Sequence, residues 1–111
     1  MRTITYLYNR EWRRKMFFKK KDESISMAEA KKLKNAAIID VRTKAEFETG
    51  SMPGAKNIEM NDVVSDTEMF LEKDKTYYIL CQSGNRSSMV CDNLSKRGYE
   101  VINIAGGMNA Y

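Results

Sequence analysis

The sequence predicts an α/β domain built around a parallel sheet. Short runs of β-branched and aromatic residues alternate with segments that carry helix-start signals, which is the pattern of repeated strand–helix–strand units. The run 36–41 is almost continuously apolar, as expected for a strand that is buried on both faces of a parallel sheet. With 111 residues the chain is long enough for one such domain and its core, but not for two.

The first predicted helix spans 27–34. Ser26 and Glu29 form a Ser-x-x-Glu capping box, in which each residue satisfies a free backbone N–H of the other at the helix start. The apolar run 36–41 follows this helix and supplies the first predicted strand.

A second capping box, formed by Thr43 and Glu46, predicts a short helix after that strand. Gly50 is expected to end this helix as the residue just beyond its C-terminus, where a left-handed conformation is common. A Pro-Gly pair then predicts a turn into a short strand at 55–58.

The second half of the chain continues the alternation. Its predicted elements are a helix at 66–73, a strand at 76–80, a helix at 87–97 and a strand at 101–104. In the longer helix, Val90, Cys91 and Leu94 stand three, four and seven positions after Ser87, so these four side chains share one helical face. Gly98 is expected to end that helix.

A cysteine stands where the strand 76–80 ends, and a short polar loop with a glycine separates it from the next helix. The backbone N–H groups of such a loop can turn inward as an anion-binding nest, and the helix dipole adds partial positive charge. Both effects lower the pKa of a thiol, and the thiolate is the reactive form. Cys81 is therefore the candidate nucleophile, and the alternative is a buried structural cysteine.

Composition limits the available chemistry. The chain has no histidine, which removes Cys-His and Ser-His pairs, and two cysteines alone do not make a plausible zinc site. We therefore expect no metal and no cofactor. The two cysteines are ten residues apart and form no disulfide framework, which favours a reducing, cytoplasmic location. No apolar run approaches the roughly 18 residues needed to span a bilayer.

The net charge of +4 is unevenly distributed. Residues 1–21 hold eight basic residues and one acidic residue, a charge of +7, whereas the remainder holds eleven basic and fourteen acidic residues, a charge of −3. We therefore divide the chain into a basic, aromatic extension at 1–23 and a domain at 24–111, and we expect no nucleic-acid partner. The extension is interpreted as a helix packed on the domain or a frayed arm, or alternatively as a weak contact with an anionic membrane surface through 1–21.

Several blocks of sequence occur in an order that is typical of one family. They are Ile38-Ile39-Asp40-Val41-Arg42 followed by Glu46-Phe47, the stretch from Gly50 to Ile58, the loop from Cys81 to Ser87, Gly98-Tyr99 with Val101, and Gly106-Gly107. In this combination, residues 24–111 resemble the single-domain rhodaneses, which are sulfurtransferases. The resemblance implies a three-layer α/β fold with a central, mostly parallel five-stranded sheet flanked by helices.

Two departures from the family pattern are visible. Ser51 stands where the family commonly has histidine, so any role of that imidazole is absent. The sequence also ends at Tyr111, soon after the double glycine, where family members often continue through an aromatic residue and a further short helix.

The resemblance implies that Cys81 attacks the outer sulfur of a donor such as thiosulfate and becomes a persulfide. Cyanide or a cellular thiol then accepts that sulfur, in a covalent, ping-pong scheme. The alternative is a persulfide carrier or sulfur-sensing module that does not turn over and instead serves a partner in a sulfur relay.

The rest of the loop is predicted to bind substrate. Gly84 allows a positive φ or a close approach of the backbone to the anion. Arg86 offers a fixed charge and forked donors, or alternatively pairs with a surface acid. Gln82, Ser83 and Asn85 mainly expose their backbone N–H groups.

Three further residues are assigned supporting roles. Ser87 is interpreted as an N-cap or a second hydrogen-bond donor, with the structural role favoured. Asp40 and Arg42 look catalytic by residue type, but in this family the matching pair is usually architectural, so an ion pair that braces the loop is the leading interpretation.

The spacing of residues in the loop distinguishes sulfur transfer from phosphatase and dithiol chemistry. Four residues lie between Cys81 and Arg86, whereas phosphatases of related fold have five, so the resemblance implies a pocket sized for sulfur. The motif is also not Cys-x-x-Cys, which disfavours a thioredoxin-type dithiol. Cys91 could act as a resolving thiol, but its place on the apolar helical face favours core packing.

Overall fold

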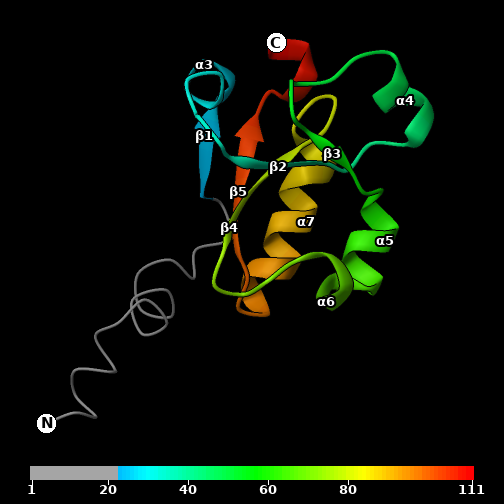
Figure 1. Cartoon of the computed structure of the whole chain (residues 1–111), viewed down its shortest axis with the longest axis vertical. Coiled ribbons are helices and arrows are strands. Elements are labelled where there is room, and N and C mark those ends of the chain that lie inside the picture. The colour runs from blue at the N-terminus through cyan, green and yellow to red at the C-terminus, as the bar shows by residue number, and fades with distance from the viewer. Residues whose placement is uncertain (1–22) are drawn as a thin grey trace, which may run out of the picture.

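The computed structural model describes residues 23–111, which form a five-stranded sheet in the order β1-β5-β4-β2-β3 (Figure 1). Every neighbouring pair of strands is parallel, which confirms the α/β class and makes the sheet fully parallel. The strands are β1 (Ser24–Ser26), β2 (Ala37–Asp40), β3 (Lys56–Asn57), β4 (Thr76–Leu80) and β5 (Glu100–Ala105). The helices are α3 (Met27–Ala30), α4 (Lys44–Glu48), α5 (Met60–Ser65), α6 (Thr67–Phe70), α7 (Asn85–Lys96) and the 3₁₀ helix η1 (Gly107–Ala110).

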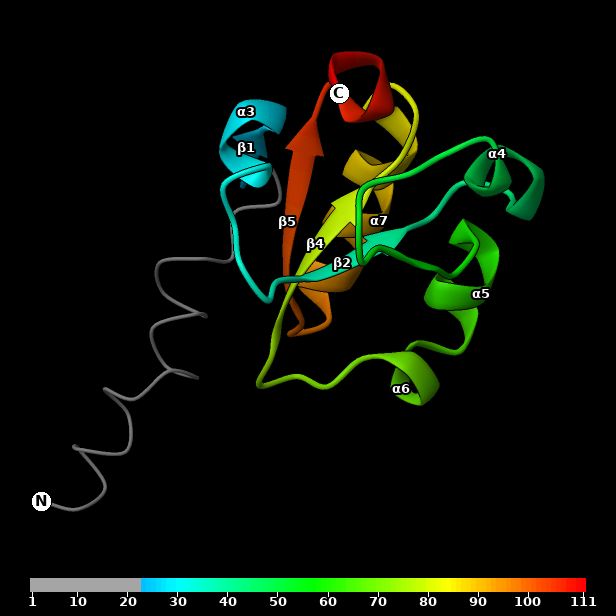
Figure 2. The same cartoon turned by 45° about the horizontal axis from the view of Figure 1, so that its top comes forward.

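The two faces of the sheet are buried by different helices, which gives the molecule three layers (Figures 1 and 2). On one face, Ile39 and Ile79 pack against the apolar side of α7 and against Val63 of α5. On the other face, Leu80 and Ile104 pack with Met27 of α3. Because successive strand residues point to opposite faces, a strand buried on both sides is apolar almost throughout, which is why 36–41 carried the strand signal.

Helix α7 has the predicted buried face, formed by Ser87, Val90, Cys91 and Leu94. It ends at the predicted glycine, since Gly98 follows the helix with a φ of +94°. It begins earlier than predicted, directly after Gly84, so the loop passes into the helix without a spacer.

Two predicted helices are wrong in extent. The helix expected over 27–34 stops at Ala30, because residues 31–35 are all exposed and offer no apolar stripe for packing, and Asn35 turns the chain with a φ of +58°. The helix expected over 66–73 is shortened to α6, and α5 before it was not predicted; the two helices meet at Asp66, whose φ of −119° and ψ of 43° are not helical.

The residue patterns also missed β1, a three-residue strand at the edge of the sheet that pairs with β5. A strand this short gives almost no alternation to detect. No helix within the described residues 23–111 is long and apolar enough to cross a membrane.

Candidate active site

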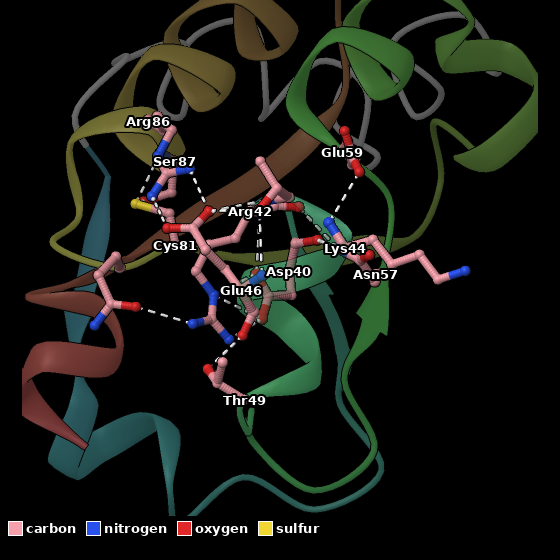
Figure 3. A network of polar contacts seen from close by, with 12 residues as sticks. Asp40, Arg42, Lys44, Glu46, Thr49, Asn57, Glu59, Cys81, Arg86 and Ser87 are labelled. Carbon is pink, nitrogen blue, oxygen red and sulfur yellow. Dashed lines mark hydrogen bonds and ion pairs between the residues drawn. The ribbon is translucent and has the colours of Figure 1, made fainter.

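The carboxyl edge of the sheet brings the predicted site residues together. Asp40 ends β2 directly opposite Leu80, the last residue of β4, and Cys81 follows at once. Parallel α/β sheets place their sites at this edge, because every loop that leaves a strand starts there. The loop from Cys81 to Ser87 lies across this edge and leads into α7 (Figure 3).

The loop surrounds the sulfur of Cys81 with hydrogen-bond donors. The backbone N–H groups of Gly84 and Ser87 lie 3.1 Å and 3.3 Å from Cys81 Sγ, and the Ser87 hydroxyl oxygen lies 3.2 Å from it. Cys81 and Ser87 are both 0% exposed, so these contacts are made in a water-poor setting. The loop is therefore the inward-turned nest that the sequence predicted.

Two opposing effects act on the pKa of the Cys81 thiol. Burial is the largest and raises the pKa, because it disfavours the charged thiolate. Hydrogen bonds from the Ser87 hydroxyl, then from the Ser87, Gly84 and Ser83 backbone, lower it. Together these donors outweigh burial, so the pKa of Cys81 lies below its ordinary value and the thiolate is favoured.

The helix η1 is hydrogen-bonded to the start of the active loop, on the side away from the sulfur. The N–H of Met108 donates to the Cys81 carbonyl and that of Asn109 to the Gln82 carbonyl, each at 2.9 Å. With both carbonyls bound on the outer side, the following N–H groups can face the sulfur. A Cβ on Gly107 would lie 2.3 Å from the Cys81 carbonyl oxygen, so only glycine allows this approach. The double glycine of the sequence was the signal for this contact.

Gly84 has the predicted left-handed conformation, with a φ of +101°. A Cβ at this position would lie 3.0 Å from the Gly106 backbone nitrogen. The glycine therefore serves both the turn of the loop and its packing against η1.

Arg86 points toward α4 and forms a two-pronged ion pair with Glu46 (Figure 3). Its Nη1 and Nη2 donate to Glu46 Oε1 and Oε2 at 2.8 Å and 3.0 Å. This contact, with further hydrogen bonds from the Thr43 backbone and hydroxyl, lowers the pKa of Glu46 to about 2, and Glu46 raises the pKa of Arg86. Pairing with an acid was the alternative interpretation of Arg86, and Glu46 was predicted only as a helix cap.

Asp40 and Arg42 form the expected ion pair, and it is almost fully buried. Arg42 Nη2 lies 2.8 Å from Asp40 Oδ2, while Nη1 donates to Gln82 Oε1 at 2.9 Å and Nη2 also donates to the Gly50 carbonyl at 2.7 Å. The pair thus ties the end of β2 to the active loop and to the segment after α4. Ser51, in place of the family histidine, donates to Asp40 Oδ2 at 2.7 Å.

Asn57 of β3 was not predicted to matter, yet it fixes the same strand end. Its Nδ2 donates to the carbonyls of Asp40 and Arg42 at 2.8 Å and 2.9 Å. A polar residue in a short strand gives no distinctive signal, because such residues are also common on exposed sheet edges.

The remaining predicted loop residues lie on the outer side. Ser83 and Asn85 are exposed, whereas the Gln82 side chain is held between Arg42 and Asn109. A depression of about 340 Å³ opens beside Gln82 and is lined by Arg42, Thr49, Gly50, Ser51, Gln82, Met108 and Tyr111.

Cys91 lies in the core on the inner face of α7, where it was predicted to pack. Burial raises the pKa of its thiol to about 12. It therefore stays protonated at neutral pH. Among residues 23–111, no group of three or more metal-ligating side chains is present.

Comparison with known proteins places this geometry in a family. The model of the family described as a rhodanese-like domain matches residues 21–111. The chain is 42% identical over 74 residues to "Putative sulfurtransferase YtwF" of Bacillus subtilis, which covers 67% of this chain and 71% of that protein. It is 38% identical over 72 residues to "Putative sulfur carrier protein YrkF" of the same organism, which covers 64% of this chain but only 38% of that protein.

A solved structure supports the same assignment. The crystal structure of a rhodanese-like domain protein from Staphylococcus aureus has a TM-score of 0.72 and 37% identity, and the match covers 79% of this chain and 89% of that one. The chain therefore belongs to the rhodanese-like domain family, and it is similar in sequence to a relative named as a putative sulfurtransferase and in fold to a solved rhodanese-like domain.

Proposed function

We propose that this protein moves sulfane sulfur through a persulfide on Cys81. The Cys81 thiolate attacks the outer sulfur of thiosulfate, a new S–S bond forms, and the original S–S bond breaks with its electron pair leaving on sulfite. Cyanide or a cellular thiolate then attacks the terminal sulfur of the persulfide. The product is thiocyanate or a new persulfide, and the Cys81 thiolate is regenerated, so no external oxidant or reductant is consumed.

The observation that carries this proposal is the convergence of donors on Cys81 Sγ. Two backbone N–H groups and one hydroxyl lie within 3.3 Å of a sulfur that has no histidine to activate it. Such donors stabilise the thiolate before attack and again when it departs as the leaving group of the second step.

We assign the binding of the donor anion to the loop and its surroundings. Arg86 is paired with Glu46, and the negative charge of a Cys81 thiolate also helps to raise the pKa of Arg86, so the two groups are electrostatically coupled. Backbone N–H groups of Gln82, Ser83, Gly84 and Asn85 are the donors we expect at the mouth. The depression beside Gln82 offers room for the acceptor.

The second candidate function is a persulfide carrier that hands its sulfur to a protein partner. It is favoured by the complete burial of the Cys81 side chain, which would protect a bound sulfur from solvent, and by the name of the relative YrkF. A relay partner is part of this proposal, as is a cytoplasmic location, where thiols stay reduced.

Thiosulfate and cyanide turnover tests the enzymatic proposal. The wild-type chain should form thiocyanate over many cycles, Cys81→Ser should form none, and Cys91→Ser, which alters the core thiol only, should keep most of the rate. Equal rates for wild type and Cys81→Ser would refute the catalytic role of this cysteine.

Intact-mass measurement after thiosulfate treatment separates the two candidates. Both require a gain of about 32 Da, one sulfur atom, on Cys81. An enzyme loses this mass repeatedly to cyanide, whereas a carrier loads once and releases its sulfur only to a suitable partner. A stable adduct on Cys91 instead would contradict both.

A further inference from the structure

The hydroxyl of Ser87 lies between two acceptors. On one side its oxygen is 3.2 Å from Cys81 Sγ, and on the other it donates to Oδ1 of Asn103. Asn103 belongs to β5, which neighbours β4 in the sheet, so its side chain approaches the loop from the strand beside Cys81. Nothing in the sequence marked it, since it is one polar residue within a strand that is otherwise mostly apolar.

The Asn103 amide has its orientation set by the loop itself. Its Nδ2 donates to the Gly84 carbonyl at 3.4 Å, which leaves Oδ1 facing Ser87. The opposite orientation would place Oδ1 against the Gly84 carbonyl oxygen, where neither acceptor carries a proton to share. Asn103 is therefore an acceptor for the Ser87 hydroxyl and not a donor to it.

A hydroxyl has a single proton, so Ser87 can donate to Asn103 or to Cys81 but not to both. When Cys81 is a neutral thiol, its S–H can donate to Ser87 Oγ while Ser87 donates to Asn103. When Cys81 is a thiolate, the Ser87 proton must turn to the sulfur, and the bond to Asn103 is lost. The two protonation states of Cys81 therefore require two different positions of one proton.

We propose that Asn103 is a positioning residue that competes with Cys81 for the Ser87 hydroxyl proton and thereby sets the balance between thiol and thiolate. It touches neither the sulfur nor a substrate; its Oδ1 acts through the Ser87 hydroxyl, while its Nδ2 is bound to the Gly84 carbonyl. This inference rests on the proposed function insofar as Cys81 is the nucleophile whose ionisation matters.

The charged groups around Cys81 do not account for the effect on its ionisation that we assign to Asn103. On α7 the relevant groups are Arg86, which is coupled electrostatically to Cys81, and Cys91, which stays protonated. At the end of β2 the charged groups are Asp40 and, two residues beyond the strand end, Arg42, which neutralise each other in a buried ion pair. On β5 the polar group that reaches the Ser87 hydroxyl is Asn103.

The test is the pH dependence of Cys81 alkylation by iodoacetamide, followed by peptide mass spectrometry. The midpoint of this profile gives the Cys81 pKa. Slow access of the reagent to the loop lowers the rate at every pH but does not move the midpoint. Asn103→Ala and the equally sized Asn103→Leu remove the competing acceptor, so each should lower the Cys81 pKa by about half to one unit. Asn61→Leu, at an exposed position on α5, should leave it unchanged.

A double-variant comparison tests whether the effect passes through Ser87. Ser87→Ala alone should raise the Cys81 pKa, because it removes a donor to the thiolate. In that background, Asn103→Leu should have no further effect on the pKa. The proposal is overturned if the Asn103 variants raise the pKa or leave it unchanged, or if they lower it equally when Ser87 is absent.

Failure of this inference is distinguishable from failure of the proposed function. Alkylation requires no sulfur donor. If the Asn103 variants lower the Cys81 pKa as expected but no persulfide forms with thiosulfate, sulfur transfer alone is rejected. If a persulfide forms but the Asn103 variants have the same Cys81 pKa as the wild type, only the positioning role of Asn103 is rejected. Urea unfolding of each variant shows whether it is folded, and the leucine variant serves if the alanine variant is not.

Discussion

At the scale of single residues, Cys81 and Cys91 show how position decides the chemistry of one residue type. Both are buried, and burial raises the pKa of each thiol. Cys91 has no compensating donors among the causes of its shift, whereas Cys81 has several, and only Cys81 ends with a lowered pKa. Directed hydrogen bonds from the loop, rather than exposure, therefore distinguish the reactive thiol.

This difference predicts selective modification. At pH 7 iodoacetamide should alkylate Cys81 at least about tenfold faster than Cys91, because the pKa of Cys81 is lowered and that of Cys91 is raised, so a larger fraction of Cys81 is thiolate. The Cys81 rate should fall as pH falls through its folded pKa, which lies below the ordinary thiol value. Cys91 should react only when the chain is unfolded in urea. Peptide mapping checks both sites, and comparable labelling of the two in the folded chain would contradict the prediction.

Glu46 joins two local structures, since its Oε1 caps α4 through Thr43 and also accepts from Arg86 of α7. Glu46→Gln keeps an oxygen for the cap and removes the charge. It should lower the free energy of unfolding at pH 7 by about 0.5–1 kcal/mol, a modest value because both side chains are about one-third exposed and screened by solvent.

The pH dependence of this effect follows from the lowered pKa of Glu46. The ordinary value of 4.5 falls to about 2 on folding, so the carboxylate stabilises the fold above pH 4.5 and this contribution is lost as pH falls toward 2. Urea unfolding of wild type and Glu46→Gln should therefore converge between these pH values. A constant difference down to pH 2 would show that the charge is not responsible.

At the scale of elements, the active loop is a two-sided structure. Its inner side donates to the sulfur, and its outer carbonyls accept from η1. The contact is close enough that Gly107 has no room for a side chain. The 3₁₀ helix is thus as much a part of the site as the loop it supports.

Gly107→Ala should separate η1 from the loop. The new Cβ would lie 2.3 Å from the Cys81 carbonyl oxygen, so the loop or the helix must move, and both stability and Cys81 alkylation at pH 7 should fall. Gly54→Ala is a matched control, because Gly54 also has a positive φ but nothing within 4 Å of an added Cβ. That control should lose only the left-handed penalty of about 1–2 kcal/mol, with Cys81 unaffected. Equal losses in the two variants would rule out the clash.

Sequence patterns predicted best where the local signal and the tertiary role coincide. The strand β4 and the buried face of α7 were predicted closely, because a strand buried on both sides and an amphipathic helix each leave a strong periodic trace. The site residue Cys81 was predicted from its place between them. In contrast, α5 buries a single residue, Val63, and gives no such trace.

Contacts between distant segments could not be predicted from residue patterns. Glu46 and Arg86 are forty positions apart, and nothing in either local pattern shows that they meet. The same holds for Asn103 and Ser87, which come together because β5 and β4 are neighbours in the sheet. Such pairs depend on strand order, which propensity and periodicity do not encode.

At the scale of the whole molecule, the charge is divided along the chain. Residues 1–21 carry +7 and lie outside the described residues, so the predicted extension and its boundary at 23 remain proposals. The remaining sequence, which forms the sheet and the site, carries −3. The predicted attraction to an anionic surface is therefore assigned to the first 21 residues.

Co-sedimentation with vesicles tests that statement. Under the membrane interpretation of the extension, the full chain should bind vesicles of mixed phosphatidylcholine and phosphatidylglycerol, and binding should weaken with added salt, since each surface lysine or arginine contributes about 1 kcal/mol. A chain lacking residues 1–21 should not bind. Equal sedimentation of the two chains, or equal binding to vesicles with and without the anionic lipid, would reject a membrane contact through this segment.

The hydrogen bond between Ser51 and Asp40 has a consequence for the pH profile of the reaction. A histidine at this position would change its charge between pH 5 and 8, whereas a serine hydroxyl does not titrate there. Because the chain contains no histidine at all, the Cys81 thiol, whose pKa lies below its ordinary value, is the group near the loop whose ionisation we expect to control the rate. The rate of sulfur loading from thiosulfate should therefore rise with pH through one apparent pKa to a plateau. A bell-shaped profile with a second, acidic group would show that another residue takes part.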